Sequence, residues 1–173
     1  IPFTDPGLTP IDPVRHRRLL RRIAREADLL VTVSRSAAAD IAAALDLPAE
    51  RVVDCSQPVS PAGAAALPPL PAGLEPGRYF LVCGAVEARK NIGRIIAAHR
   101  TSGTAMPLVI AGPDGWGVKH FTAQIRDNPT VVRLPYQPRD AILALLSRAR
   151  ALVMPSLAEG FGLPVAEAMA QIG

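Results

Sequence analysis

Aromatic residues make up only 4% of this 173-residue chain, which has just two cysteines and three histidines. The cysteines, Cys55 and Cys83, lie in or beside apolar runs without metal-ligand spacing, so we expect reduced thiols and no metal site. No stretch comes near the ~18 consecutive apolar residues that a membrane-spanning helix requires, and no signal peptide is recognisable. These absences together predict a cytoplasmic protein.

The rest of the composition is typical of a chain that folds. Hydrophobic residues make up 49% and charged residues 20%, which excludes a disordered chain. With so few aromatic residues, the core must consist of Leu, Val, Ile and Ala, as in the buried strands and covering helices of α/β proteins.

Short apolar runs alternate with helical patterns along the chain, and Ser34 and Asn91 are placed to cap the helices that follow them. The alternation predicts parallel βαβ units and a doubly wound sheet in the second half. The expected helices are 14–27, 35–45, 91–100, 118–127, 139–149 and one that opens near Pro164, and the expected strands are 29–34, 51–54, 79–83, 108–111, 131–134 and 151–154.

The stretch 58–77 differs in composition from the chain on either side. Its sequence, PVSPAGAAALPPLPAGLEPG, is too rich in Pro, Ala and Gly for a regular element and predicts a linker. We therefore expect one domain over 1–57 and a second over 78–173.

Ligands of doubly wound sheets bind beyond the carboxyl ends of the strands, and the most distinctive loop there is EGFGLPVAE. Gly160 and Gly162 let the backbone approach a ligand, while Pro164 suits a first helical turn, on which we also expect Glu167. Free amides at such a helix start bind hydroxyls or phosphate. The alternative is that Glu159 is a solvated loop carboxylate and Glu167 a first-turn acid favoured by the helix dipole.

The segment EGFGLPVAEAMA, which begins at Glu159, resembles the signature of the retaining glycosyltransferases of GT-B fold known as family four. YFLVCGAVEARKN resembles the first strand and phosphate loop of their donor domain, and PLVIAGPDGWG the next strand and turn. VVRLPYQPRDAILALLSRARALVMPS resembles their nucleotide-base segment, and ADLLVTVSRSAAADI the last strand and helix of their acceptor domain. The resemblance implies an α/β, GT-B-type fold. In it, 78–173 is a Rossmann-like, parallel-sheet donor domain truncated at its C-terminus, and 1–57 is the C-terminal remnant of the acceptor domain.

The resemblance also implies roles for particular residues. Glu159 would contact the transferred sugar and the charge at its anomeric carbon, and Lys90 and Arg89 would hold the diphosphate leaving group. A cation at that place stabilises the transition state more than the ground state, because the leaving group gains charge. Glu167 would bind the ribose hydroxyls. The remaining donor-binding positions are Gly84, Phe161, Gly162 and Leu163.

The implied reaction is the transfer of a hexose, with mannose as one candidate, from a nucleoside-diphosphate sugar to a glycan or lipid-linked saccharide. No metal or other cofactor is expected. The resemblance favours front-face displacement, although a double displacement through a carboxylate also retains configuration. The Gly-rich loop of the acceptor domain is not present, so we expect the chain on its own to be inactive.

Three positions depart from the family pattern: Ala85 replaces an Arg of the phosphate loop, Pro135 replaces a Gly, and Ser56-Gln57-Pro58 replaces Pro-Asn-Gly. The first two support an alternative, a non-catalytic donor-like scaffold or regulatory domain.

The net charge of +4 is partly local, because six arginines lie between Arg15 and Arg25 on one predicted helix. A solvated helix face is the plainest interpretation. The alternative is contact with an anionic membrane surface, which would suit a lipid-linked acceptor and place the protein at the cytoplasmic face. Nucleic acid is not an expected partner, since no aromatic platform or RNA-binding motif accompanies the arginines.

Overall fold

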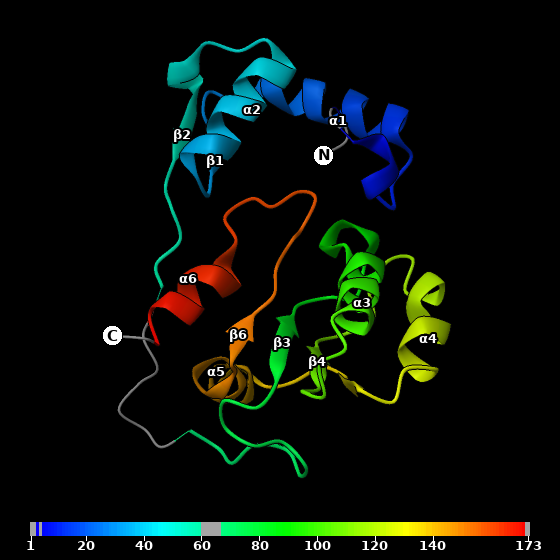
Figure 1. The fold of residues 1–173 in the computed structure, drawn as a ribbon. Coiled ribbons are helices and arrows are strands. Elements are labelled where there is room, and N and C mark those ends of the chain that lie inside the picture. The colour runs from blue at the N-terminus through cyan, green and yellow to red at the C-terminus, as the bar shows by residue number, and fades with distance from the viewer. Residues whose placement is uncertain (1–2, 4, 60–66, 172–173) are drawn as a thin grey trace. The chain divides into compact units, whose positions relative to one another are not determined.

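The computed structural model describes residues 3, 5–59 and 67–171 of the chain. The chain forms two compact units (Figure 1). The first unit contains Ile1–Pro58 and Ala158–Gly162, and the second contains Val59–Leu157 and Leu163–Gly173. Both units are α/β with parallel sheets, so the predicted fold class is confirmed.

The first unit has a two-stranded parallel sheet in which Leu30 of β1 pairs with Val52 of β2. Its helices begin where the sequence places capping residues. The Asp12 carboxylate accepts from the backbone N–H of Arg15 at 2.7 Å, and the Ser34 hydroxyl accepts from that of Ala37 at 3.1 Å. The elements are η1 (Pro6–Leu8), α1 (Pro13–Glu26), β1 (Leu30–Thr32), α2 (Arg35–Leu45), η2 (Ala49–Arg51) and β2 (Val52–Asp54).

The second unit has a four-stranded parallel sheet in the order β5-β4-β3-β6. Its strands are β3 (Phe80–Cys83), β4 (Leu108–Ala111), β5 (Val131–Leu134) and β6 (Ala151–Leu152). Its helices are η3 (Ala88–Lys90), α3 (Ile92–Thr101), α4 (Lys119–Arg126), α5 (Arg139–Arg148) and α6 (Leu163–Met169).

The central strands β3 and β4 are covered on both faces, which explains why they are continuous apolar runs without alternation. On one face, Leu81 and Val109 pack with Leu145 of α5. On the other, Val82 and Ile110 pack with apolar residues of α3. The core of the second unit is therefore built from aliphatic side chains on either side of one sheet.

The strand order places a topological switch point beside β3. From β3 the chain moves outward through β4 to β5, and then crosses back to β6 on the other side of β3. The strand order therefore reverses between β3 and β6, and doubly wound sheets bind ligands at such a point. The carboxyl end of β3 is therefore a candidate site independently of any motif.

The predicted linker 58–77 includes residues 60–66, which lie outside the described residues. Leu67, Leu70 and Leu74 are partly buried and pack against the core of the second unit. The Arg148 guanidinium also donates to the Pro68 carbonyl at 2.7 Å.

Candidate functional site

The loop after β3 brings Lys90 against the backbone of Gly84. A Cβ added to Gly84 would lie 3.3 Å from Cε and 3.6 Å from Nζ of Lys90. The Lys90 side chain therefore folds back toward the end of β3, and the residue is only 8% exposed. Gly84 leaves room for this ammonium group and supplies a φ of 121°, which L residues rarely adopt.

The ends of β3 and β4 approach each other closely at a second glycine. A Cβ on Gly112, whose φ is 145°, would lie 2.6 Å from the Gly84 carbonyl carbon. The two loops then continue side by side, since the Val86 N–H donates to the Pro113 carbonyl at 2.9 Å and the Gly115 N–H to the Val86 carbonyl at 3.1 Å. At this edge of the sheet, the backbones of the loops that follow β3 and β4 are therefore in direct contact.

The loop after β3 is also tied to the segment that follows β6. The Leu157 N–H donates to the Arg89 carbonyl at 2.8 Å, and the Asn91 amide donates to the Pro155 carbonyl at 3.2 Å. The Arg89 guanidinium forms an ion pair with Glu87 at 2.5 Å. These bonds hold both loops of the switch point together.

Asn91 occupies the N-cap position of α3, as predicted, but the expectation that its side chain makes the capping bond was wrong. Asn91 has a left-handed φ of 59° and makes no side-chain capping bond. Asn tolerates this conformation better than most residues, and its side chain is used to reach Pro155 instead.

Glu167 is 3% exposed and forms an ion pair with Arg139 at the start of α5. The expectation that Glu167 lies on the first turn of its helix was wrong: α6 begins at Leu163 and has no acidic residue in its first turn. Glu167 thus lies one turn further along, where its side chain turns into the second unit and Arg139 compensates the burial of its charge.

Cys83, at the end of β3, is close enough to both Lys90 and Glu167 for their charges to act on its thiol. The pKa of the Cys83 thiol is raised to about 11, mainly by burial; the negative charge of Glu167 also raises this pKa, and the positive charge of Lys90 lowers it. Both charges therefore act at the carboxyl end of β3. Gly84, Lys90 and Glu167, which were selected from separate parts of the sequence, are brought to one place.

The raised pKa of Cys83 predicts a loss of stability in alkaline solution. The protonated thiol favours the folded state fully below pH 9, the ordinary pKa, and this contribution is lost as the pH rises toward about 11. Across this pH range, we expect the free energy of unfolding of wild type to fall by about 2 kcal/mol more than that of the Cys83→Ala variant. Urea unfolding at each pH measures both. Equal pH dependence in the two proteins would contradict the burial of an un-ionised thiol.

Of the remaining predicted residues, Glu159, Phe161 and Gly162 lie in the segment Ala158–Gly162, which groups with the first unit. There the Ser34 hydroxyl donates to the Gly160 carbonyl at 2.6 Å, and Gly162 has a φ of 79°. Glu159 is exposed and Phe161 is half-buried. Leu163 begins α6 in the second unit.

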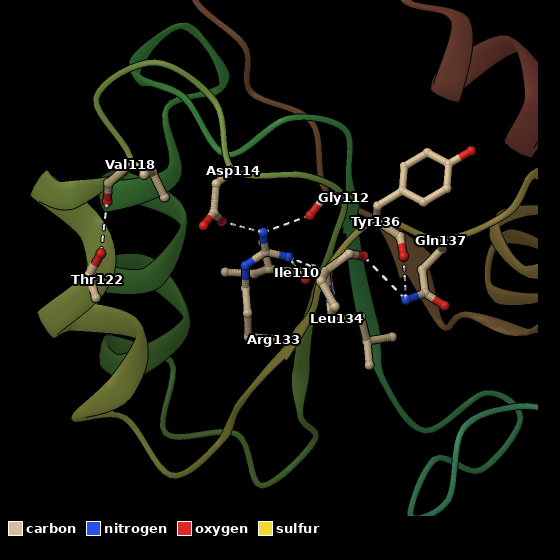
Figure 2. A network of polar contacts seen from close by, with 10 residues as sticks. Ile110, Gly112, Asp114, Val118, Thr122, Arg133, Leu134, Tyr136 and Gln137 are labelled. Atoms are coloured by element: carbon tan, nitrogen blue, oxygen red, sulfur yellow. Dashed lines mark hydrogen bonds and ion pairs between the residues drawn. The ribbon is translucent and has the colours of Figure 1, made fainter.

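Arg133, for which no sequence motif predicts a role, organises the edge of β4 (Figure 2). Its guanidinium donates to the Ile110 carbonyl at 3.1 Å, to the Gly112 carbonyl at 2.6 Å and to the Asp114 carboxylate at 2.8 Å. It also contacts the Leu134 carbonyl. The Asp114 carboxylate therefore accepts a charged hydrogen bond.

Arg133→Ala is expected to lower the free energy of unfolding by about 1–3 kcal/mol, because it leaves buried carbonyls without a donor. Arg126→Ala is the matched control, since Arg126 pairs with its exposed neighbour Asp127, and its loss should leave the urea midpoint unchanged. Similar midpoints for the two variants would contradict this role of Arg133.

Arg139 was also missed, although the sequence contains a signal for it. An arginine at the first residue of a helix is disfavoured by the helix dipole, and α5 begins at Arg139. Its pairing with Glu167 offsets that cost.

Within the described residues, no group of three His, Cys, Asp or Glu side chains is arranged to hold a metal ion. None of the helices in those ranges has both the length and the hydrophobicity needed to cross a bilayer.

Residues 72–171 match the family model described as "Glycosyl transferases group 1". The chain belongs to the group 1 glycosyltransferases. This group 1 chain is 31% identical to the O-antigen chain mannosyltransferase B of Escherichia coli, over 96% of the chain and 48% of that protein. It is also 32% identical to the E. coli serotype-specific mannosyltransferase WbdA over 51% of the chain and 12% of that protein. The chain thus spans at most about half the length of these relatives.

The solved structure of Anabaena HepE in complex with UDP and glucose is similar to this glycosyltransferase chain, with a TM-score of 0.74 and 18% identity. The match covers 95% of this chain and 48% of HepE. At this level of identity the likeness concerns the fold, which is that of GT-B glycosyltransferases.

Proposed function

We propose that the second unit binds a nucleoside-diphosphate sugar beside the carboxyl end of β3, as the donor side of a retaining hexosyltransferase. The observation that carries the proposal is the convergence of Gly84, Lys90 and Glu167 around Cys83, at the switch point of the sheet. A cation beside a glycine backbone suits a diphosphate, and a buried carboxylate suits paired ribose hydroxyls.

The reaction breaks the bond between the anomeric carbon and a diphosphate oxygen, and forms a bond from that carbon to an acceptor hydroxyl oxygen. The acceptor hydroxyl loses its proton, and the nucleoside diphosphate leaves with an added negative charge. Lys90 stabilises that charge, and Arg89 adds to the positive potential of the same loop. The diphosphate can leave without a metal because these cations are fixed before the bond breaks.

The loop that begins at Glu159 is assigned to the transferred sugar. Glu159 would face the positive charge that develops at the anomeric carbon, and the backbone amides of Phe161, Gly162 and Leu163 would donate to sugar hydroxyls. The left-handed φ of Gly162 supports this assignment, because it turns the backbone immediately before α6 begins.

Mannose is the first sugar to test, because the curated relatives are mannosyltransferases of O-antigen chains. The acceptor class that fits these relatives is a growing glycan or a lipid-linked saccharide. No cofactor beyond the sugar nucleotide is proposed.

The proposal is tested by incubating the protein, with any residues that precede or follow this sequence included, with GDP-mannose or UDP-glucose and a saccharide acceptor. NMR of the product should show an anomeric configuration equal to that of the donor, without added metal. Inversion of configuration, or an absolute metal requirement, would contradict the proposal.

A second candidate is a donor-like scaffold without catalysis. The ion pair between Glu167 and Arg139 favours it, since Arg139 already engages the carboxylate assigned to the ribose. Under this alternative, nucleotides bind weakly and no transfer product forms with any donor.

A further inference from the structure

One face of α1 carries a hollow lined by arginines. Val14, Arg17, Arg18, Arg21 and Arg25 surround a volume of about 290 Å³. Their spacing of three and four residues places them along one side of the helix. This surface, called the arginine face below, belongs to the first unit, whereas β3 belongs to the second.

Few of these charges are neutralised by the protein itself. In the part of the chain that the structure describes, no carboxylate forms an ion pair with Arg18, Arg21 or Arg25, whereas Arg22, outside the hollow, pairs with Glu26 at 2.8 Å. Like charges at this helical spacing repel one another. An external anion that enters the hollow would relieve this repulsion.

Apolar groups accompany the arginine face. Val14 is 63% exposed within the hollow, and Ile11, just before the helix, is 49% exposed. The guanidinium carbons of Arg17 and Arg21 lie 5.8 and 5.5 Å from the centre of the Phe3 ring. Cations with apolar side chains beside them are typical of helices that lie at a membrane surface.

We propose that the arginine face docks on an anionic lipid surface, with phosphate headgroups in the hollow and Val14 and Ile11 against the acyl boundary. A nucleic acid would use the arginines alone and leave both apolar side chains in water, so the exposed Val14 and Ile11 favour lipid. The inference does not depend on the proposed function, because none of these residues belongs to the donor site.

The test measures partition of the protein onto phosphatidylcholine vesicles with and without phosphatidylglycerol, by co-sedimentation. Replacing Arg18, Arg21 and Arg25 together by Gln should lower binding to anionic vesicles roughly 100-fold, since each surface cation contributes about fivefold. The control replaces the exposed Arg78, Arg94 and Arg100 by Gln, which removes the same charge elsewhere and should change binding only slightly. Melting curves check that both triple variants fold.

Val14→Ser is the second variant, and it leaves the charge unchanged. It should weaken vesicle binding several-fold and leave binding to duplex DNA unaffected, because only the lipid surface accepts an apolar side chain. Equal losses in the two triple variants would show a bulk charge effect and overturn the proposal. Tighter binding to DNA than to anionic vesicles, or no preference for anionic over neutral vesicles, would overturn it as well.

Discussion

Gly112→Ala is expected to lower the free energy of unfolding by about 3–5 kcal/mol, the sum of overpacking and backbone strain. The added Cβ would lie 2.6 Å from the carbonyl carbon of Gly84, and neither backbone can move without breaking the pairing of β3 and β4. The φ of 145° adds strain that any L residue would carry. Urea unfolding of the variant measures the loss.

Gly103→Ala is the matched control for this substitution. Gly103 also has a positive φ, 64°, but a Cβ there would meet nothing within 4 Å. Its cost should therefore be backbone strain alone, about 1 kcal/mol. If both variants lost the same stability, the close approach of the strand ends would not be a constraint on this fold.

Lys90→Ala is expected to lower kcat for sugar transfer by about 100- to 1000-fold, the range seen when one preorganised electrostatic group is removed from an active site. The ammonium is held against the backbone of Gly84 before the leaving group departs, so its effect is concentrated in the transition state. Initial rates with saturating donor measure this loss.

Lys119→Ala provides the control, since Lys119 is exposed at the start of α4. It should leave kcat unchanged. An equal kcat for Lys90→Ala and wild type, with unchanged melting temperature, would show that another group stabilises the diphosphate.

Several elements of the fold follow from local sequence. The strands over 108–111 and 131–134 and the helix over 35–45 have the predicted bounds, because β-branched runs and the Ser34 cap are local signals. The strand expected over 151–154 is only Ala151–Leu152, since its length depends on its pairing with β3. Strand pairing is a tertiary property that a short apolar run does not reveal.

The candidate site likewise combines features that local sequence predicts with features that depend on tertiary structure. Gly84, Lys90 and Glu167 could be selected from spacing and resemblance, whereas their meeting around Cys83 could not, because it depends on the order of strands in the sheet. The pairing of Glu167 with Arg139 joins residues 28 positions apart and likewise has no local pattern. The two wrong expectations, for Asn91 and the first turn of α6, concerned single residues at helix starts, where one position changes the side chain's environment.

The central claim is that Lys90 and Glu167 form a nucleotide-binding site, and calorimetric titration of GDP, UDP and ADP tests it most directly. The titration uses wild type, Lys90→Ala, Glu167→Ala and the control Lys119→Ala. We predict that one nucleotide binds wild type and the control equally, and that each site variant weakens it by about 1–3 kcal/mol, the value of a charged hydrogen bond. Binding of none of the three nucleotides, or binding that ignores both substitutions, would contradict the account.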